Sequence, residues 1–178
     1  MRSMAPLQVA MTGVRMGERY LQVFCHDTAL TRGLATKSGL SGVAALAAPD
    51  EAQAKRAKAA GEKAGALIDI KVGPVSNLTW PEASFDMVVI DETGGGFSSL
   101  TRQERAATLE SVTGVLRAGG RAEIIERMTG GLLGGARAVP SEYSQSGGAE
   151  GALRDAGFRP VRTLAEKDGF RFIEGLKG

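Results

Sequence analysis

The chain has 178 residues, 43% of them hydrophobic and 24% charged, which is typical of soluble globular proteins. Its net charge is only +2, its 22 lysines and arginines form no basic run and its aromatic content is 5%, so a nucleic-acid-binding or membrane-surface protein is not expected. A single cysteine, an N-terminus that makes a poor signal peptide and no apolar run of about 18 residues predict one cytoplasmic domain over residues 1–178, without a membrane span or internal disulfide framework.

Strands and helices are expected to alternate from the start of the chain. The apolar segments that predict strands are residues 20–24, 42–47 and 67–72. The segments that predict helices are residues 28–37 and 50–63. Asp27 or Thr28 can cap the first helix and Gly39 follows it, while Asp50 stands at the start of the second helix and Gly65 follows its end.

The second half continues the alternation after a long connection, Gly73 to Ser84, that has no helical pattern. Strands are predicted at residues 85–90, 122–126, 162–165 and 170–176. Helices are predicted at residues 101–117 and 149–156, the first of them opened by a Thr-x-x-Glu capping box. The continuous apolar run 85–90 is typical of a strand that is buried on both faces. This order predicts an α/β fold with a largely parallel sheet and helices on both faces.

Three segments of the second half carry a family resemblance. They are Leu-Thr-Trp-Pro-Glu-Ala-Ser-Phe-Asp at 78–86, Val-Leu-Arg-Ala-Gly-Gly-Arg at 115–121 and Ala-Leu-Arg-Asp-Ala-Gly-Phe at 152–158. The chain resembles the class I S-adenosylmethionine-dependent methyltransferases over about residues 17–176. The resemblance implies their Rossmann-like fold, a seven-stranded, mostly parallel sheet. One strand, 170–176, would run antiparallel between 122–126 and 162–165.

The resemblance also implies a cofactor site at the carboxyl ends of the strands. Residues 20–35 align without a gap to the family's first strand and glycine-rich loop. The acidic position of that motif is Gln22, and its three glycine positions are Phe24, His26 and Thr28. A glycine lets the backbone approach a ligand because it has no Cβ, so these side chains would obstruct the cofactor.

The remaining cofactor positions are also altered. Leu46 and Ala47 stand where a carboxylate would bind the ribose, and Pro74 stands where an aspartate would lie beside the adenine. Asp50 and Glu51 follow, but both favour the helix N-terminus. The positions that the resemblance assigns to the cofactor are Gln22, Phe24, Cys25, His26, Thr28, Leu46, Ala47, Pro74, Val75 and Asp91. Their composition predicts that S-adenosylmethionine binds weakly or not at all.

No other catalytic chemistry is indicated. His26 is the only histidine, and its neighbours Cys25 and Asp27 would point in other directions, so no metal site is expected. Dinucleotide-binding, phosphate-binding and hydrolase loop motifs do not occur in the sequence. Catalytic residues therefore stay unassigned.

Two glycine-rich loops are candidate contact segments. In residues 91–97 the pair Asp91 and Glu92 could bind a cation or act as a base, but the favoured interpretation is a solvated, mobile loop. In residues 128–140 two glycine pairs bracket Leu132 and Leu133, which suits a lid, a partner contact or a loop packed over the sheet edge.

Two functional hypotheses follow. The first is a methyltransferase with a remodelled S-adenosylmethionine site and an unknown methyl acceptor. The second is a pseudoenzyme, a non-catalytic relative that acts as a binding or assembly subunit. The partner, a small molecule or a protein, and the choice between homo- and hetero-oligomer stay open.

Overall fold

The computed structural model describes residues 5–128 and 138–178. Its seven strands are β1 (Arg19–Val23), β2 (Val43–Ala48), β3 (Ile68–Val72), β4 (Phe85–Asp91), β5 (Leu116–Arg127), β6 (Val161–Lys167) and β7 (Phe170–Leu176). Its helices are α1 (Ala5–Thr12), α2 (Thr28–Ser38), α3 (Glu51–Ala64), α4 (Arg102–Val115), α5 (Ser141–Gln145) and α6 (Gly148–Asp155).

All strands belong to one sheet with the order β3-β2-β1-β4-β5-β7-β6. Strands β1 to β5 pair in parallel, and β7 pairs antiparallel with both β5 and β6. The predicted Rossmann-like arrangement, with its last strand inserted antiparallel between β5 and β6, is therefore confirmed.

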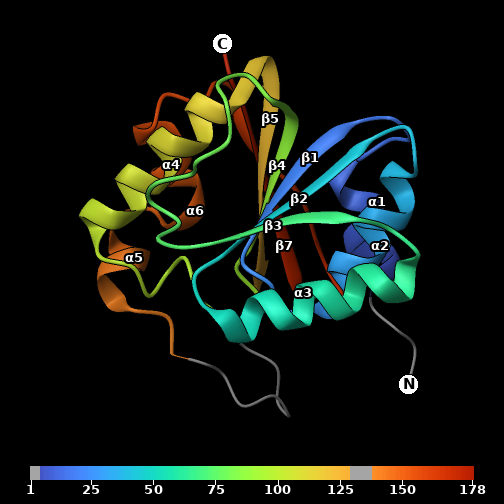
Figure 1. Cartoon of the computed structure of the whole chain (residues 1–178). Helices are drawn as coiled ribbons and strands as arrows, with labels where there is room; N and C mark the ends of the chain where they lie inside the picture. Colours follow the sequence, from blue (N-terminus) through green and yellow to red (C-terminus); the bar gives the residue numbers. More distant parts are fainter. Residues whose placement is uncertain (1–4, 129–137) are drawn as a thin grey trace.

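The helices form a layer on each face of the sheet (Figure 1). Helices α4, α5 and α6 cover one face, where Leu109, Tyr143 and Leu153 join a core cluster with Val88 and Ile90 of β4. Helices α1, α2 and α3 cover the other face. Because neighbouring side chains of a strand point to opposite faces, each central strand contributes side chains to the core on both faces of the sheet.

Helix ends follow the expected capping chemistry. Asp27 caps α2 by accepting from the amides of Ala29 and Leu30, and Asp50 caps α3. Thr101 and Glu104 form the predicted capping box at α4. Each side-chain acceptor satisfies an amide that has no partner inside its helix.

Three features differ from the sequence-based expectation. Helices α1 and α5 were not predicted, and β5 begins at Leu116 rather than at 122. Helix α1 is held by packing of Leu7, Val9 and Met11 on the core cluster beneath it, which a local pattern does not reveal. Leu116 adopts an extended backbone conformation directly after α4 and pairs with Phe85, so β5 starts earlier than predicted.

Residues 73–84 contain neither helix nor strand, as predicted. Across the two described ranges, no helix combines the length and apolar character needed to cross a bilayer. The segment 130–135, with Leu132 and Leu133, lies outside the described residues.

Candidate functional site

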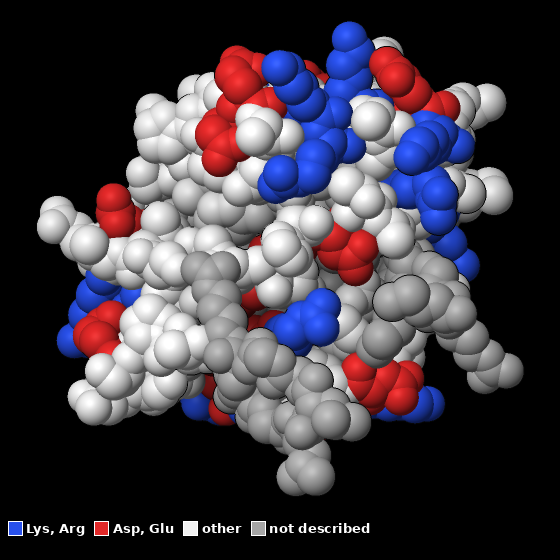
Figure 2. Space-filling model, turned by 90° about the horizontal axis from the view of Figure 1, so that it is seen from below, with Lys and Arg blue, Asp and Glu red and all other residues white. Residues whose placement is uncertain are grey.

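The sheet reverses its strand order between β1 and β4, since β2 and β3 follow on one side of β1 and β4 lies on the other. Ligands of open α/β sheets bind at such a point, beyond the carboxyl ends of the strands. Residues 24–27 connect β1 to α2 at this position. Figure 2 views the molecule from below, the side where Figure 1 shows α3.

Phe24 is the first residue after β1 and has a φ of 66°. This left-handed conformation is the one that glycine adopts without strain, so the loop keeps a glycine-type backbone although it carries a phenylalanine. The ring is 4% exposed and belongs to the core cluster that contains Val75, Ile90 and Phe97. The Phe24 amide donates to the carbonyl of Ala47, 3.0 Å away.

Two ring side chains of the loop after β1 pack against the loop after β4. A Cβ added at Gly96 would lie 2.9 Å from Cδ1 of Phe24, and one added at Gly94 would lie 2.5 Å from Cγ of His26. Real Cβ contacts are not this short, so both rings pack directly against glycine backbone. The Phe24 ring is buried, and His26 is exposed. The two loops thus close against each other over the crevice between β1 and β4.

The backbone donors of the first loop already have partners within the chain. Oδ2 of Asp91 accepts from the amides of His26 and Asp27, each at 2.9 Å. Oδ1 of Asp91 accepts from the amide and the hydroxyl of Thr93. The fully buried Asp91 carboxylate therefore serves the backbone of both loops.

Helix α3 fixes the same loop from the opposite side. Oε1 of Gln53 accepts from the Cys25 amide at 2.7 Å, and Nε of Arg56 donates to the Cys25 carbonyl at 3.1 Å. The Cys25 thiol is buried, packs with the core beneath α3, and has a raised pKa because burial disfavours the thiolate. Both backbone groups of Cys25 and its side chain are thus used for structure.

Gln22, at the acidic position of the implied motif, points into the layer beneath α2. Its Nε2 donates to the Phe24 carbonyl at 2.8 Å and to the Thr31 hydroxyl at 3.0 Å. A carboxylate could not donate these bonds. The glutamine therefore stabilises the β1–α2 connection in place of an acidic side chain.

The expectation of a solvated loop at Asp91 and Glu92 is wrong. Asp91 is fully buried and Glu92 is 7% exposed. The Glu92 oxygens accept from the amides of Phe97 and Ser98 at 2.6 and 3.1 Å. Burial raises the pKa of Glu92 from its ordinary 4.5 to about 7, against the opposing effect of these hydrogen bonds. The two carboxyls organise the loop backbone instead of facing solvent.

The remaining predicted positions do not gather into one cavity wall. Leu46 is buried in the core beneath α3, and Ala47 lies in the cluster on the opposite face of the sheet. Pro74 and Thr28 are exposed, while Val75 is buried. Asp50 accepts from the amide of Gln53 as the cap of α3, in agreement with the structural role predicted for it.

These residues do not fit S-adenosylmethionine in the manner that the resemblance implies. Phe24 and His26 fill the space against Gly96 and Gly94, and the loop amides are paired with Asp91 and Gln53. The end of β2 offers alanine and leucine side chains in place of a carboxylate for ribose hydroxyls. Within residues 5–128 and 138–178, no group of three or more histidine, cysteine, aspartate or glutamate side chains is placed to hold a metal ion.

Sequence reasoning missed the residues that hold the loops together. Gln53 and Arg56 stand one helical turn apart on α3, a spacing that marks a shared face but does not name what the face contacts. The run Gly94 to Gly96 was interpreted as a sign of mobility. In the structure Gly96 and Gly94 leave space for the rings of Phe24 and His26, which lie 72 and 68 residues earlier in the chain.

Comparisons with known proteins agree with this architecture. A family model described as a methyltransferase domain matches residues 23–124, more than half of the chain. No curated protein matches the chain.

Solved structures provide the second comparison. A SAM-dependent methyltransferase from Aquifex aeolicus has a TM-score of 0.80 at 18% identity, with 98% of this chain and 90% of that chain covered. A SAM-dependent O-methyltransferase from Thermotoga maritima has a TM-score of 0.69 at 17% identity, with 97% and 64% covered. A SAM-dependent methyltransferase from Methanosarcina mazei has a TM-score of 0.63 at 16% identity, with 94% and 96% covered. At these identities the likeness shows the fold alone.

Proposed function

Because the chain belongs to the methyltransferase domain family, we propose that it is a non-catalytic member of that family, a pseudoenzyme that acts as a binding or assembly subunit. In this proposal the ordinary cofactor crevice is closed by the protein's own side chains, and the fold serves as a scaffold for a protein partner. A cytoplasmic location is part of this proposal, since a chain whose single cysteine is free and buried needs no oxidising compartment.

The observation that carries this proposal is the pairing of the loop after β1. The amides of Cys25, His26 and Asp27 donate to the side chains of Gln53 and Asp91. A ligand that used these donors would first have to displace both acceptors. An anionic ligand would also meet the buried Asp91 carboxylate behind the loop.

Free-energy estimates favour a crevice that stays closed over one that opens to admit a ligand. Breaking three such hydrogen bonds costs about 1–2 kcal/mol each, and exposing a buried phenylalanine ring costs about 2–3 kcal/mol. The sum, roughly 5–9 kcal/mol, compares with the 8.2 kcal/mol that a ligand of about 1 μM affinity supplies. Opening would therefore leave binding at millimolar strength or weaker.

Isothermal titration calorimetry with S-adenosylmethionine and S-adenosylhomocysteine tests the proposal. We expect dissociation constants weaker than about 100 μM for both compounds. A low-micromolar constant for either would overturn it. A Phe24→Gly/His26→Gly variant, shown to be folded by circular dichroism, should bind more tightly than the parent, because its crevice is unfilled.

The second candidate is a methyltransferase that uses a remodelled loop, and Glu92 is the observation that favours it. A buried carboxyl with a pKa of about 7 next to the end of β4 has the protonation behaviour of a general base. Both Glu92 oxygens, however, accept backbone amide hydrogen bonds, which favours a structural role. Tight cofactor binding in the calorimetry would favour this candidate over the first.

A further inference from the structure

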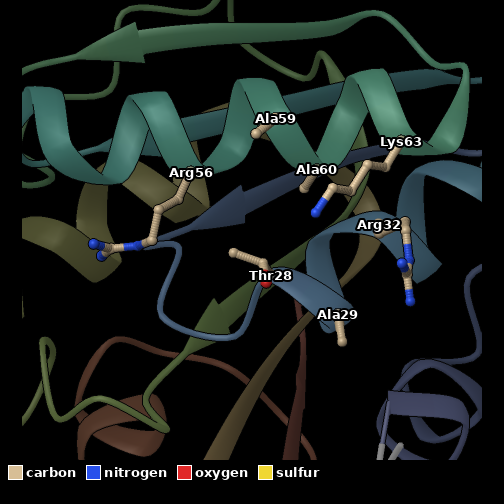
Figure 3. A pocket seen from close by; sticks show the side chains of 7 residues that line it. All are labelled: Thr28, Ala29, Arg32, Arg56, Ala59, Ala60 and Lys63. Carbon is tan, nitrogen blue, oxygen red and sulfur yellow. The ribbon is translucent and has the colours of Figure 1, made fainter.

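A pocket of about 180 Å³ lies between α2 and α3, outside the crevice described above. Three cationic side chains line it, Arg32 from α2 and Arg56 and Lys63 from α3 (Figure 3). Ala29, Ala59 and Ala60 supply an apolar wall. Of the residues described, none that lines this pocket carries a carboxylate.

Two of the three cations have no partner in the part of the chain that the structure describes. Among the described residues, neither the Arg32 guanidinium nor the Lys63 ammonium group makes a hydrogen bond or ion pair. In Figure 3 the Lys63 side chain extends from α3 toward α2, on which Arg32 stands. Both side chains are exposed and carry positive charge at the same pocket, so an anion bound there would be favourable.

Arg56 has a different role at the other end of the pocket. Its Nε donates to the Cys25 carbonyl, and Figure 3 shows its side chain directed away from Lys63. Arg56 therefore contributes a positive potential here but is held by the β1–α2 loop. Arg32 and Lys63 are the groups free to contact a ligand.

Two amides at the N-terminus of α2 are not available as binding donors. The amides of Ala29 and Leu30 are already taken by the Asp27 side chain. Thr28 can offer its exposed hydroxyl, which lines the pocket. Recognition would consequently rest on side-chain charge and on the size of the pocket.

We propose that this pocket binds the phosphate group of a small phosphorylated metabolite. Lys63 and Arg32 pair with the phosphate oxygens, and the methyl groups of Ala29, Ala59 and Ala60 contact the organic part of the ligand. The size of the pocket favours a small molecule over a polymer. Figure 2 also shows acidic side chains among the lysines and arginines that gather at one edge of its face, and this mixture does not suit a nucleic-acid backbone.

The proposal is independent of whether the protein binds S-adenosylmethionine. Inorganic phosphate and pyrophosphate are the probes, titrated into the full chain at constant ionic strength and followed by calorimetry and amide chemical shifts. We expect pyrophosphate to bind saturably with a dissociation constant of about 1 mM or tighter. Phosphate should bind more weakly, with shifts confined to α2 and α3.

The Arg32→Gln/Lys63→Gln variant should weaken pyrophosphate binding at least tenfold. The matched control is Lys55→Gln/Lys58→Gln, which removes the same charge from exposed positions of α3 that do not line the pocket. The control should bind like the parent. Equal weakening in both variants, or no saturation in the parent up to about 10 mM pyrophosphate, would overturn the proposal.

Discussion

Oδ2 of Asp91 lies 2.9 Å from the backbone nitrogen of His26, and this hydrogen bond joins the end of β4 to the loop that follows β1. The same oxygen also accepts a hydrogen bond from the amide of Asp27, and the second carboxylate oxygen accepts one from the amide of Thr93. One buried carboxylate thus determines the conformation of two loops that are distant in sequence.

Asp91→Asn should lower the free energy of unfolding by about 2–4 kcal/mol. The amide that replaces one carboxylate oxygen is a donor and must face a backbone or hydroxyl donor, which leaves buried groups without partners. Urea denaturation at pH 7 measures the change. Asp155→Asn, at an exposed position of α6, is the matched control and should stay within about 0.5 kcal/mol of the parent. Equal stability of Asp91→Asn and the parent would show that the loops are fixed by packing alone.

At Phe24 the glycine variant should be more stable than the alanine variant, which is the reverse of the usual order of stability. Both Phe24→Ala and Phe24→Gly remove a buried ring and should destabilise by about 2–5 kcal/mol. Because φ is 66° at this residue, the glycine variant should be the more stable of the two by about 1 kcal/mol. Thermal unfolding of both variants measures the order.

The control pair for this comparison is Leu34→Ala and Leu34→Gly, at a buried position inside α2. There alanine should be more stable by about 1 kcal/mol, as in other helix interiors. The same order at both sites would mean that residue 24 does not keep its left-handed backbone in solution.

The fold was predictable because its signals are local. The apolar run of β4, the Asp27 cap and the Thr101–Glu104 capping box each lie within a few residues, and strand order followed from the family resemblance. Helix α1 was missed because its stability comes from packing on α2 and the sheet. Such tertiary contacts cannot be predicted from a local sequence pattern.

The site was predictable only in part, for the same physical reason. The alignment predicted that Phe24 and His26 obstruct the cofactor, and in the structure Phe24 belongs to the same core cluster as Ile90. The acceptors that hold the loop, Gln53 and Asp91, come from other elements. Hydrogen bonds between distant segments become visible only in three dimensions.

Gly96→Ala should displace the ring of Phe24. The added methyl would lie 2.9 Å from Cδ1 of that ring, and φ at Gly96 is not left-handed, so the effect would come from crowding alone. We expect a loss of about 1–3 kcal/mol in the free energy of unfolding. Gly114→Ala is the control, since its Cβ would meet no atom within 4 Å in α4, and it should stabilise the protein by up to about 1 kcal/mol. A Gly96→Ala variant as stable as the parent, with unchanged chemical shifts for the Phe24 ring, would contradict the close packing.

Stability should fall as the pH rises from about 4.5 to 7, because burial raises the pKa of Glu92 to about 7. The unfolded chain releases the Glu92 proton near 4.5, whereas the folded protein retains it, so deprotonation favours unfolding over this range. The contribution of Glu92 is roughly 3 kcal/mol. Urea titrations at pH 5, 6 and 7 measure the slope, which should be smaller in Glu92→Gln. A slope of the same size in that variant would assign the pH dependence to other groups.

Glu123→Gln should stabilise the protein at pH 8. Glu123 is fully buried in β5 and lies directly opposite Glu174 of β7, and neither of its oxygens has a hydrogen-bond partner among the residues that the structure describes. Burial and the nearby Glu174 raise the pKa of Glu123 well above 4.5, so the folded state disfavours the charge that the unfolded chain carries at high pH. The gain from a neutral amide should be present at pH 8 and shrink as the pH falls toward 4.5, where the unfolded carboxyl is neutral as well. Glu62→Gln, exposed on α3, should change the unfolding free energy by less than about 0.5 kcal/mol at either pH. If Glu123→Gln is less stable than the parent at pH 8, the carboxylate must be ionised and paired in the folded protein, and its burial without a partner would be disproved.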